Sequence, residues 1–243
     1  MHAKLLVPME SPTTVETPPL GAEDAGAEPS AAARRRLIWT IAGIVIGGLL
    51  LVGIGLLASE RSAAESEWAG TVLASPQAKP EIVLTDTSGQ PYDLRAETAG
   101  TTTILMFGYT SCPDVCPINL ASLDGALDEL GDNRSNGVRV VFVTVDPERD
   151  TPEVLRRYLD QFDSNFVGLT GTPEEIRAAQ AAADVPGAVR DPQTTPDGYT
   201  VGHASQLIAY QPDGQARIVY PFGTRQSDWT RDLRRLLTGE QPS

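Results

Sequence analysis

Hydrophobic residues follow two different patterns along the chain. The first is one unbroken stretch, 37–58, which holds 22 residues and no charge. At about 1.5 Å of rise per helical residue, this length matches a bilayer core of about 30 Å. Three arginines at 34–36 come directly before it and favour a cytoplasmic N-terminus. The stretch therefore predicts a single transmembrane helix in the cytoplasmic membrane, with the rest of the chain extracytoplasmic.

A cleaved signal peptide is the alternative interpretation of this stretch. It is disfavoured because the apolar run exceeds the usual length of about 7–15 residues and a long segment precedes it. No cysteine lies directly after the run, which argues against a lipoprotein anchor, while a late cut near Ala58 or Ala64 stays open. Residues 1–36, rich in Ala, Pro, Glu and Thr, are expected to form a disordered cytoplasmic tail, and 59–79 a linker.

The second pattern covers residues 80–239, where short apolar runs alternate with stretches of helical periodicity. The nearly continuous apolar runs at 102–109 and 138–145 are typical of strands buried on both faces. Further strands are expected at 81–84, 91–94, 166–169, 199–210 and 216–220, and helices at 117–130, 151–162, 173–183 and 227–237. This order predicts an α/β domain of the thioredoxin-like layout, with a central mixed sheet flanked by helices.

Local signals refine this outline at three places. The three-residue spacing of Asp150 and Glu153 suggests a capping box for the second helix. The run 172–175, Thr-Pro-Glu-Glu, is expected to cap the third. Residues 185–198 are rich in Pro, Gly, Asp and Thr and are predicted to form a long loop, which in a compact domain is often functional.

Charge excludes one class of partner. The chain has 32 acidic and 19 basic residues, a net charge of -13. Nucleic-acid binding depends on Lys and Arg that neutralise phosphates, so this balance argues against it. The acidic surface is consistent with solubility or with cationic partners.

The only two cysteines, Cys112 and Cys116, lie where the apolar run 102–109 meets the expected start of a helix. A proline follows each of them and pushes the residue before it out of helical geometry. We therefore expect an extended Cys112, Cys116 near the N-cap, and Pro117 at the first helical position. The positive end of a helix dipole lowers thiol pKa and favours thiolate, so this placement predicts redox or metal chemistry.

Four simple interpretations of the cysteine pair each meet an objection. Buried inert thiols are common, but not with this spacing at the start of a helix. A structural disulfide closing so short a loop would remove little chain entropy. A zinc staple usually takes four Cys or His ligands, and the predicted domain has three. A thioredoxin-type dithiol normally has two intervening residues rather than three.

One histidine, His203, completes a possible metal site. It is the only histidine besides His2 of the tail, and it lies early in the strand after the long loop. In a thioredoxin-like sheet that edge faces the helix that carries the dithiol. Thiolates select Cu(I) and imidazole also suits copper. Cys112, Cys116 and His203 are therefore predicted to bind copper as Cu(I) or Cu(II).

Three motifs in order resemble the Sco/SenC family: the run 107–117 around the cysteines, the run 145–152 (Val-Asp-Pro-Glu-Arg-Asp-Thr-Pro), and Val201-Gly202-His203. The resemblance covers roughly residues 80–237, and a membrane anchor before it is also typical of the family. It implies a thioredoxin-like fold and copper binding through Cys112, Cys116 and His203.

The resemblance further implies a role in building the binuclear copper centre of cytochrome c oxidase, by delivering copper, by reducing that site's cysteines, or both. The implied partners are the copper-site subunit of the oxidase and other copper chaperones or thiol reductants. The leading hypothesis is thus a membrane-anchored copper metallochaperone. Many family members carry an acidic residue just before the histidine, and this chain has Gly202 there. Asp146 and Asp114 are candidates to replace it, although turn and cap chemistry is the simpler interpretation of both.

Two enzymatic alternatives remain. In a thiol-disulfide oxidoreductase, Cys112 or Cys116 would attack a partner disulfide and form a mixed disulfide. General reductases of this fold place a cis-proline beside the dithiol, and 199–210 has no proline, which counts against broad specificity. A peroxidase of the peroxiredoxin kind shares the layout, but is least favoured because the two cysteines lie close together and beside a strand with a histidine.

Overall fold

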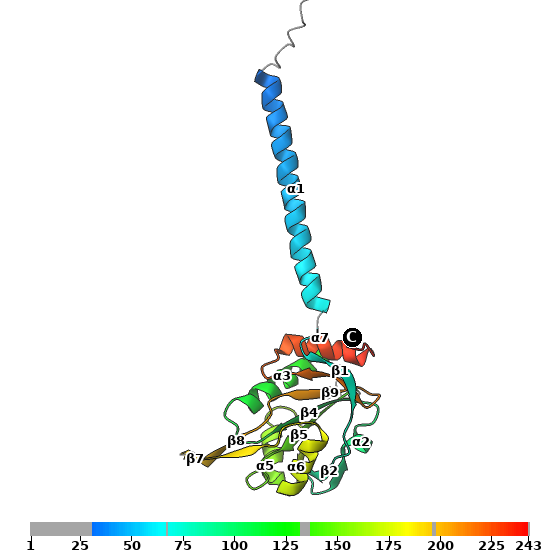
Figure 1. The fold of residues 1–243 in the computed structure, drawn as a ribbon, viewed down its shortest axis with the longest axis vertical. Helices are drawn as coiled ribbons and strands as arrows, with labels where there is room; N and C mark the ends of the chain where they lie inside the picture. The colour runs from blue at the N-terminus through cyan, green and yellow to red at the C-terminus, as the bar shows by residue number, and fades with distance from the viewer. Residues whose placement is uncertain (1–30, 67, 132–136, 196–197, 243) are drawn as a thin grey trace, which may run out of the picture. The chain divides into compact units, whose positions relative to one another are not determined.

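A computed structural model describes residues 31–66, 68–131, 137–195 and 198–242. The chain divides into two compact units, Met1–Ser62 and Ala63–Ser243 (Figure 1). The helix α1 (Ala31–Ser66) begins before the predicted span 37–58 and continues beyond it into the predicted linker. In the described ranges, no helix combines the length and the apolar character needed to cross a membrane. Most of the predicted tail, residues 1–30, lies outside the described residues.

The second unit is built on an eight-stranded sheet, which is mixed, as the sequence predicts. Strands β4 (Thr102–Gly108), β5 (Val138–Thr144) and β6 (Val167–Thr170) pair parallel, and the other neighbours pair antiparallel. Every residue of β4 is buried, which explains its continuous apolar sequence. The strand order is β1 (Thr71–Ala78), β10 (Gln215–Tyr220), β9 (Leu207–Tyr210), β4 (Thr102–Gly108), β5 (Val138–Thr144), β6 (Val167–Thr170), β2 (Val83–Asp86) and β3 (Pro91–Asp93).

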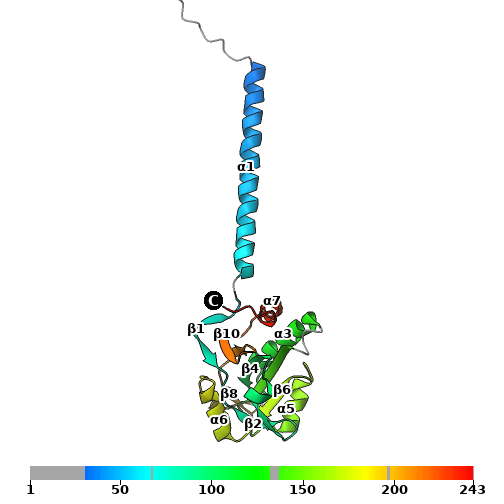
Figure 2. The ribbon, with the colours of Figure 1, turned by 90° about the vertical axis from the view of Figure 1, so that its right-hand side faces the viewer.

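Helices cover both faces of this sheet (Figure 2). Alternate residues of β4 divide the core: Ile104 and Met106 pack with one set of helices, and Leu105 and Phe107 with the other. The first set is α3 (Val115–Leu130), α5 (Pro152–Leu159) and α7 (Gln226–Leu237), and the second is α2 (Leu94–Glu97) and α6 (Pro173–Ala182). This arrangement confirms the predicted thioredoxin-like α/β architecture of the domain.

One edge of the sheet corrects the predicted linker. Residues 71–78 form β1, which pairs antiparallel with β10 from Thr71 opposite Val219 to Ala78 opposite Gln215. An edge strand exposes most of its side chains and needs few apolar residues, which hid it in the sequence. The register shifts between Val72 and Gln77, and a proline lies in that interval, where a missing N–H donor is tolerated.

The predicted loop 185–198 is also wrong in part. Residues 189–195 form β7 (Val189–Thr195), which pairs with β8 (Gly198–Gly202) in a two-stranded ribbon separate from the main sheet. The single strand predicted for 199–210 is accordingly two strands, β8 and β9. The backbone bonds of a ribbon are local, so its polar composition and proline do not prevent pairing.

Helix starts differ from prediction at two of three places. Helix α3 begins at Val115 with Asp114 as N-cap, so Cys116 is its second residue and Pro117 its third. A proline is tolerated there because the first N–H groups of a helix have no partner within it. Helix α5 is capped by Thr151 rather than by Asp150, whereas the capping box of Thr172 and Glu175 on α6 is confirmed.

Candidate metal centre

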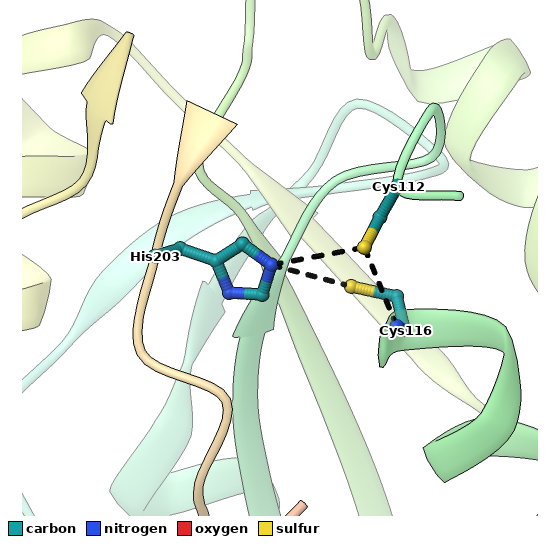
Figure 3. Close-up of side chains that lie close together, drawn as sticks. All are labelled: Cys112, Cys116 and His203. Atoms are coloured by element: carbon teal, nitrogen blue, oxygen red, sulfur yellow. Dashed lines mark hydrogen bonds between the residues drawn. The ribbon is translucent and has the colours of Figure 1, made fainter. Parts of the chain in front are cut away.

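The three predicted ligands lie together at the end of β4, although they come from three parts of the chain (Figure 3). Cys112 lies in the loop after β4, Cys116 in the first turn of α3, and His203 directly after β8. The Nε2 atom of His203 is 3.9 Å from Sγ of Cys112 and 3.7 Å from Sγ of Cys116. The cysteines are 7% and 0% exposed, and the histidine is half-buried. The site is therefore shielded from solvent on the sulfur side and open on the side of the ring.

A backbone carbonyl orients the imidazole. Nδ1 of His203 lies 2.8 Å from the carbonyl oxygen of Ala204, so Nδ1 donates its proton there, and Nε2, which faces the sulfurs, is the nitrogen that can bind a metal once it has lost its own proton. That tautomer is the one that a metal ligand needs, and its partner fixes the ring. The ring of Tyr109 adds an edge contact, with centroids 5.5 Å apart and planes at 90°.

Asp114 and Asp146, the candidates to replace the carboxylate before His203, form hydrogen bonds and ion pairs with other groups. Asp114 accepts a hydrogen bond from the backbone N–H of Val115 at 2.7 Å, which is ordinary cap chemistry. Asp146 is 3% exposed, forms a close ion pair with Arg149, and accepts a hydrogen bond from the Tyr199 hydroxyl at 2.8 Å. The carbonyl of Ala204 takes the orienting role instead, and no side-chain pattern could have revealed it.

Electrostatics make the two thiols unequal. A hydrogen bond from the Cys116 thiol lowers the pKa of Cys112 far below the usual range, and bonds from His203 and the Cys116 backbone N–H act in the same direction against burial. The same contact, together with burial, raises the pKa of Cys116. Burial lowers the pKa of His203, but its bonds to Cys112 and Ala204 outweigh that effect and raise it overall. These opposite shifts make Cys112 the more acidic thiol of the metal-free pair.

Two residues that the sequence analysis did not assign to the site help to build it. Asp150 is fully buried and accepts hydrogen bonds from the N–H of Thr110 at 3.0 Å, the hydroxyl of Thr110 at 2.6 Å and the hydroxyl of Thr144 at 2.5 Å. It therefore joins the cysteine loop to the end of β5. Gly108 ends β4 where an added Cβ would lie 2.6 Å from Sγ of Cys116. The position of Asp150 inside the run 145–152 was the available signal, but cap spacing offered a simpler explanation.

The chain is similar to proteins of known sequence and structure. A family model described as SCO1/SenC matches residues 73–238. Protein SenC of Rhodobacter capsulatus is 38% identical over 133 residues, which cover 51% of this chain and 59% of that protein.

Two solved structures share the fold. Apo Sco1 of Thermus thermophilus has a TM-score of 0.63 at 32% identity, covering 70% of this chain and 98% of that one. Copper-bound ScoI of Arabidopsis thaliana has a TM-score of 0.60 at 28% identity, covering 70% and 99%. The family model spans well over half of the sequence, and this chain therefore belongs to the SCO1/SenC family.

Proposed function

We propose that this protein is a membrane-anchored copper metallochaperone that helps to assemble the binuclear copper site of cytochrome c oxidase. One observation carries the proposal: two thiol sulfurs and one imidazole nitrogen lie within 4.8 Å of one another. Soft thiolates select Cu(I), and an imidazole suits both oxidation states of copper. The copper-bound structure of Arabidopsis ScoI, which has the same fold, supports the choice of metal.

The spacing of the donors fits a three-coordinate ion. With the bond lengths typical of zinc, about 2.3 Å to sulfur and about 2.0 Å to nitrogen, bonds set about 120° apart place a sulfur and a nitrogen roughly 3.7 Å from each other. The two nitrogen–sulfur distances in the metal-free site are 3.7 Å and 3.9 Å. Little movement is therefore needed to load the ion. Within the described part of the chain, the group includes no fourth His, Cys, Asp or Glu, and this leaves a position for a ligand from a partner during transfer.

The membrane anchor and the location of the domain belong to the same proposal. The uncharged stretch 37–58 and the arginines at 34–36 support a single span with the N-terminus in the cytoplasm. The domain would then work outside the cytoplasm, close to the membrane in which an oxidase subunit resides. Its partners would be that copper-site subunit and the chaperones or reductants that load the protein.

Anaerobic copper titration of the reduced full-length protein in detergent tests the proposal. We expect a single copper per chain, with a thiolate-to-copper charge-transfer band for Cu(II) that is lost in Cys112→Ser. His203→Ala should weaken Cu(II) binding strongly and Cu(I) binding less, because both thiolates remain. Absence of copper binding, with a disulfide that forms and reduces reversibly, would refute the metallochaperone and favour the second candidate.

That second candidate is a thiol-disulfide oxidoreductase that reduces the cysteines of a copper-site partner. The unequal thiols favour it: the Cys112 thiolate would attack the partner disulfide and expel one partner thiolate, and Cys116 would then attack the mixed disulfide and release the second. The sequence between Tyr199 and Tyr210 contains no proline, which counts against a broad-specificity reductase. Cys116→Ser should trap the mixed disulfide, and failure to trap any partner would dispose of this candidate.

A further inference from the structure

The third donor of the site is carried by a segment that needs outside support. Cys112 and Cys116 are bound to the main sheet through β4 and α3, but His203 follows β8, which belongs to the separate ribbon. An isolated pair of strands is at best marginally stable in water. The position of the imidazole therefore depends on whatever holds β8 against the domain.

Tyr199, near the start of β8, is held between two guanidinium groups. The Cζ atom of Arg149 lies 3.8 Å from the centroid of its ring, and Cζ of Arg190 lies 3.9 Å from it. Arg149 comes from the turn after β5, on the main domain, whereas Arg190 comes from β7 of the ribbon itself. Arg149 therefore joins the ribbon to the domain by stacking on Tyr199 directly, and Arg190 adds an exposed ion pair with Glu148 of the same turn.

Hydrogen bonds reinforce the stacking of Arg149 on Tyr199. Nη1 of Arg149 donates to the backbone carbonyl of Tyr199 at 3.0 Å, and the hydroxyl of Tyr199 donates to Asp146 at 2.8 Å. Asp146 and Arg149 also form a close ion pair with each other. A planar guanidinium can stack and donate at once, which a lysine in its place could not do. The tyrosine is thus held at its ring, its hydroxyl and its backbone.

The contacts continue from this stack to the imidazole. Tyr109, directly after β4, has Arg149 at 5.7 Å from its ring centroid and accepts a hydrogen bond from the N–H of Val201 at 3.4 Å. The same ring meets the edge of His203. The segment before His203 is therefore fixed at Tyr199 and at Val201, four and two residues upstream of the imidazole.

We propose that Arg149 and Tyr199 are positioning residues for His203, which hold β8 against the domain so that the imidazole meets the two sulfurs. The inference rests on the proposed copper site and assigns a role to two residues that bind no copper. On the downstream side, the amide of Asn119 donates to the carbonyl of Ser205 at 3.3 Å, so the histidine loop is secured at both ends. Loss of the upstream contacts frees the imidazole and leaves both sulfurs in place.

This separation of imidazole from sulfurs gives the proposal a specific signature. Cu(II) binding depends on the imidazole, and Cu(I) binding is mostly a property of the two thiolates. Residues that orient a metal ligand typically contribute about 10–100-fold to affinity. In the full-length protein, Arg149→Ala and Tyr199→Leu should therefore weaken Cu(II) binding by about tenfold or more, and Cu(I) binding by less than about threefold. Tyr199→Phe keeps the stacked ring and should recover most of the Cu(II) affinity.

A matched control and a double variant separate positioning from general damage. Arg235 stacks on Trp68 at 3.9 Å, away from the site, and Arg235→Ala should leave both affinities unchanged. In a His203→Ala background, Tyr199→Leu should cause no further loss of Cu(II) affinity, since its effect acts through the imidazole. A measurement without metal adds to these: diethyl pyrocarbonate should modify His203 several times faster in Tyr199→Leu than in wild type, read by peptide mass spectrometry.

Each outcome bears on one proposal. Equal weakening of Cu(I) and Cu(II), an undiminished effect of Tyr199→Leu in the His203→Ala background, or unchanged modification of His203 would refute the positioning role. A wild-type protein that binds no copper would refute the proposed function instead, and the modification rate of His203 would still decide whether Tyr199 holds the ring.

Discussion

Replacing Gly108 with alanine tests whether the close approach of a sulfur to β4 builds the metal site. The added Cβ would lie 2.6 Å from Sγ of Cys116 and 2.8 Å from a ring carbon of Phe142. Ordinary contacts begin near 3.4 Å, so the sulfur must retreat by roughly 0.8 Å or β4 must shift. Phe142 and Cys116 are both fully buried, which leaves neither of them free space.

The magnitude follows from that displacement. Overpacking of a well-packed core costs about 1–3 kcal/mol of unfolding free energy. Metal–ligand distances tolerate deviations of only about 0.2 Å, a quarter of the required retreat of Cys116. We therefore expect Gly108→Ala to lower the unfolding free energy by about 2 kcal/mol and to weaken Cu(I) binding by at least about tenfold, since each 1.4 kcal/mol of lost ligation is a factor of ten.

The assay pairs urea unfolding with competitive Cu(I) titration, and the chain supplies its own control. Gly202 adjoins His203, yet a Cβ added there would meet only the carbonyl oxygen of Val189 at 3.6 Å. Gly202→Ala should leave stability and Cu(I) affinity close to wild type. If Gly108→Ala binds Cu(I) with unchanged affinity, the packing of Cys116 against β4 does not determine the site geometry, and the reasoning fails.

Three further predictions concern charge and buried polar groups. Lys79 is 4% exposed and donates to neutral oxygens of Thr98 and Thr103, and burial lowers its pKa to about 8. Above pH 8 the unfolded chain therefore binds more protons than the folded one, so the unfolding free energy should rise between pH 8 and 9.5, by about 1–2 kcal/mol after solvent screening. Urea unfolding over a series of pH values measures this rise, and Lys79→Met should not show it. Asp150→Ala should lower the unfolding free energy by about 3 kcal/mol and weaken copper binding, because it leaves the donors of the cysteine loop without an acceptor. A variant that unfolds in urea like wild type would contradict this. At pH 6, brief treatment with iodoacetamide should alkylate Cys112 at least about tenfold faster than Cys116, and equal labelling in peptide maps would exclude a thiolate located on Cys112.

The parts of the fold that the sequence predicts correctly are those with strong local signals. The buried strands β4 and β5 appear as apolar runs, and the α6 cap as Thr172 with Glu175. The edge strand β1 has no strong signal, because a strand that buries little surface needs few apolar residues. The ribbon strand β7 has none because its sequence is mostly polar and contains a proline. Their pairing partners are set by tertiary contacts, which periodicity does not record.

The metal ligands could be predicted from the sequence, but the groups that orient them could not. Residue type and order were enough to group Cys112, Cys116 and His203, because thiol and imidazole chemistry is visible in the sequence. The groups that orient these ligands have no such chemical signature. The carbonyl of Ala204 has no side-chain signature, and Asp150 has the spacing of a helix cap while its side chain bonds to the cysteine loop. Roles of that kind depend on which segments the fold brings together.

The run 145–152 shows how a motif without a ligand can belong to a metal site. Backbone bonds from Arg149 and Asp150 to the carbonyl of Asp146, at 3.1 Å and 3.0 Å, close it into a tight turn at the end of β5. From this turn, Asp150 holds the loop that carries Cys112, while Asp146 and Arg149 hold the strand that leads to His203. This one turn therefore holds both segments that carry the metal ligands, and its internal geometry contributes to the distance between sulfur and nitrogen. A change that distorts the turn should alter both kinds of ligand at once, whereas a change in Tyr199 should alter the imidazole alone.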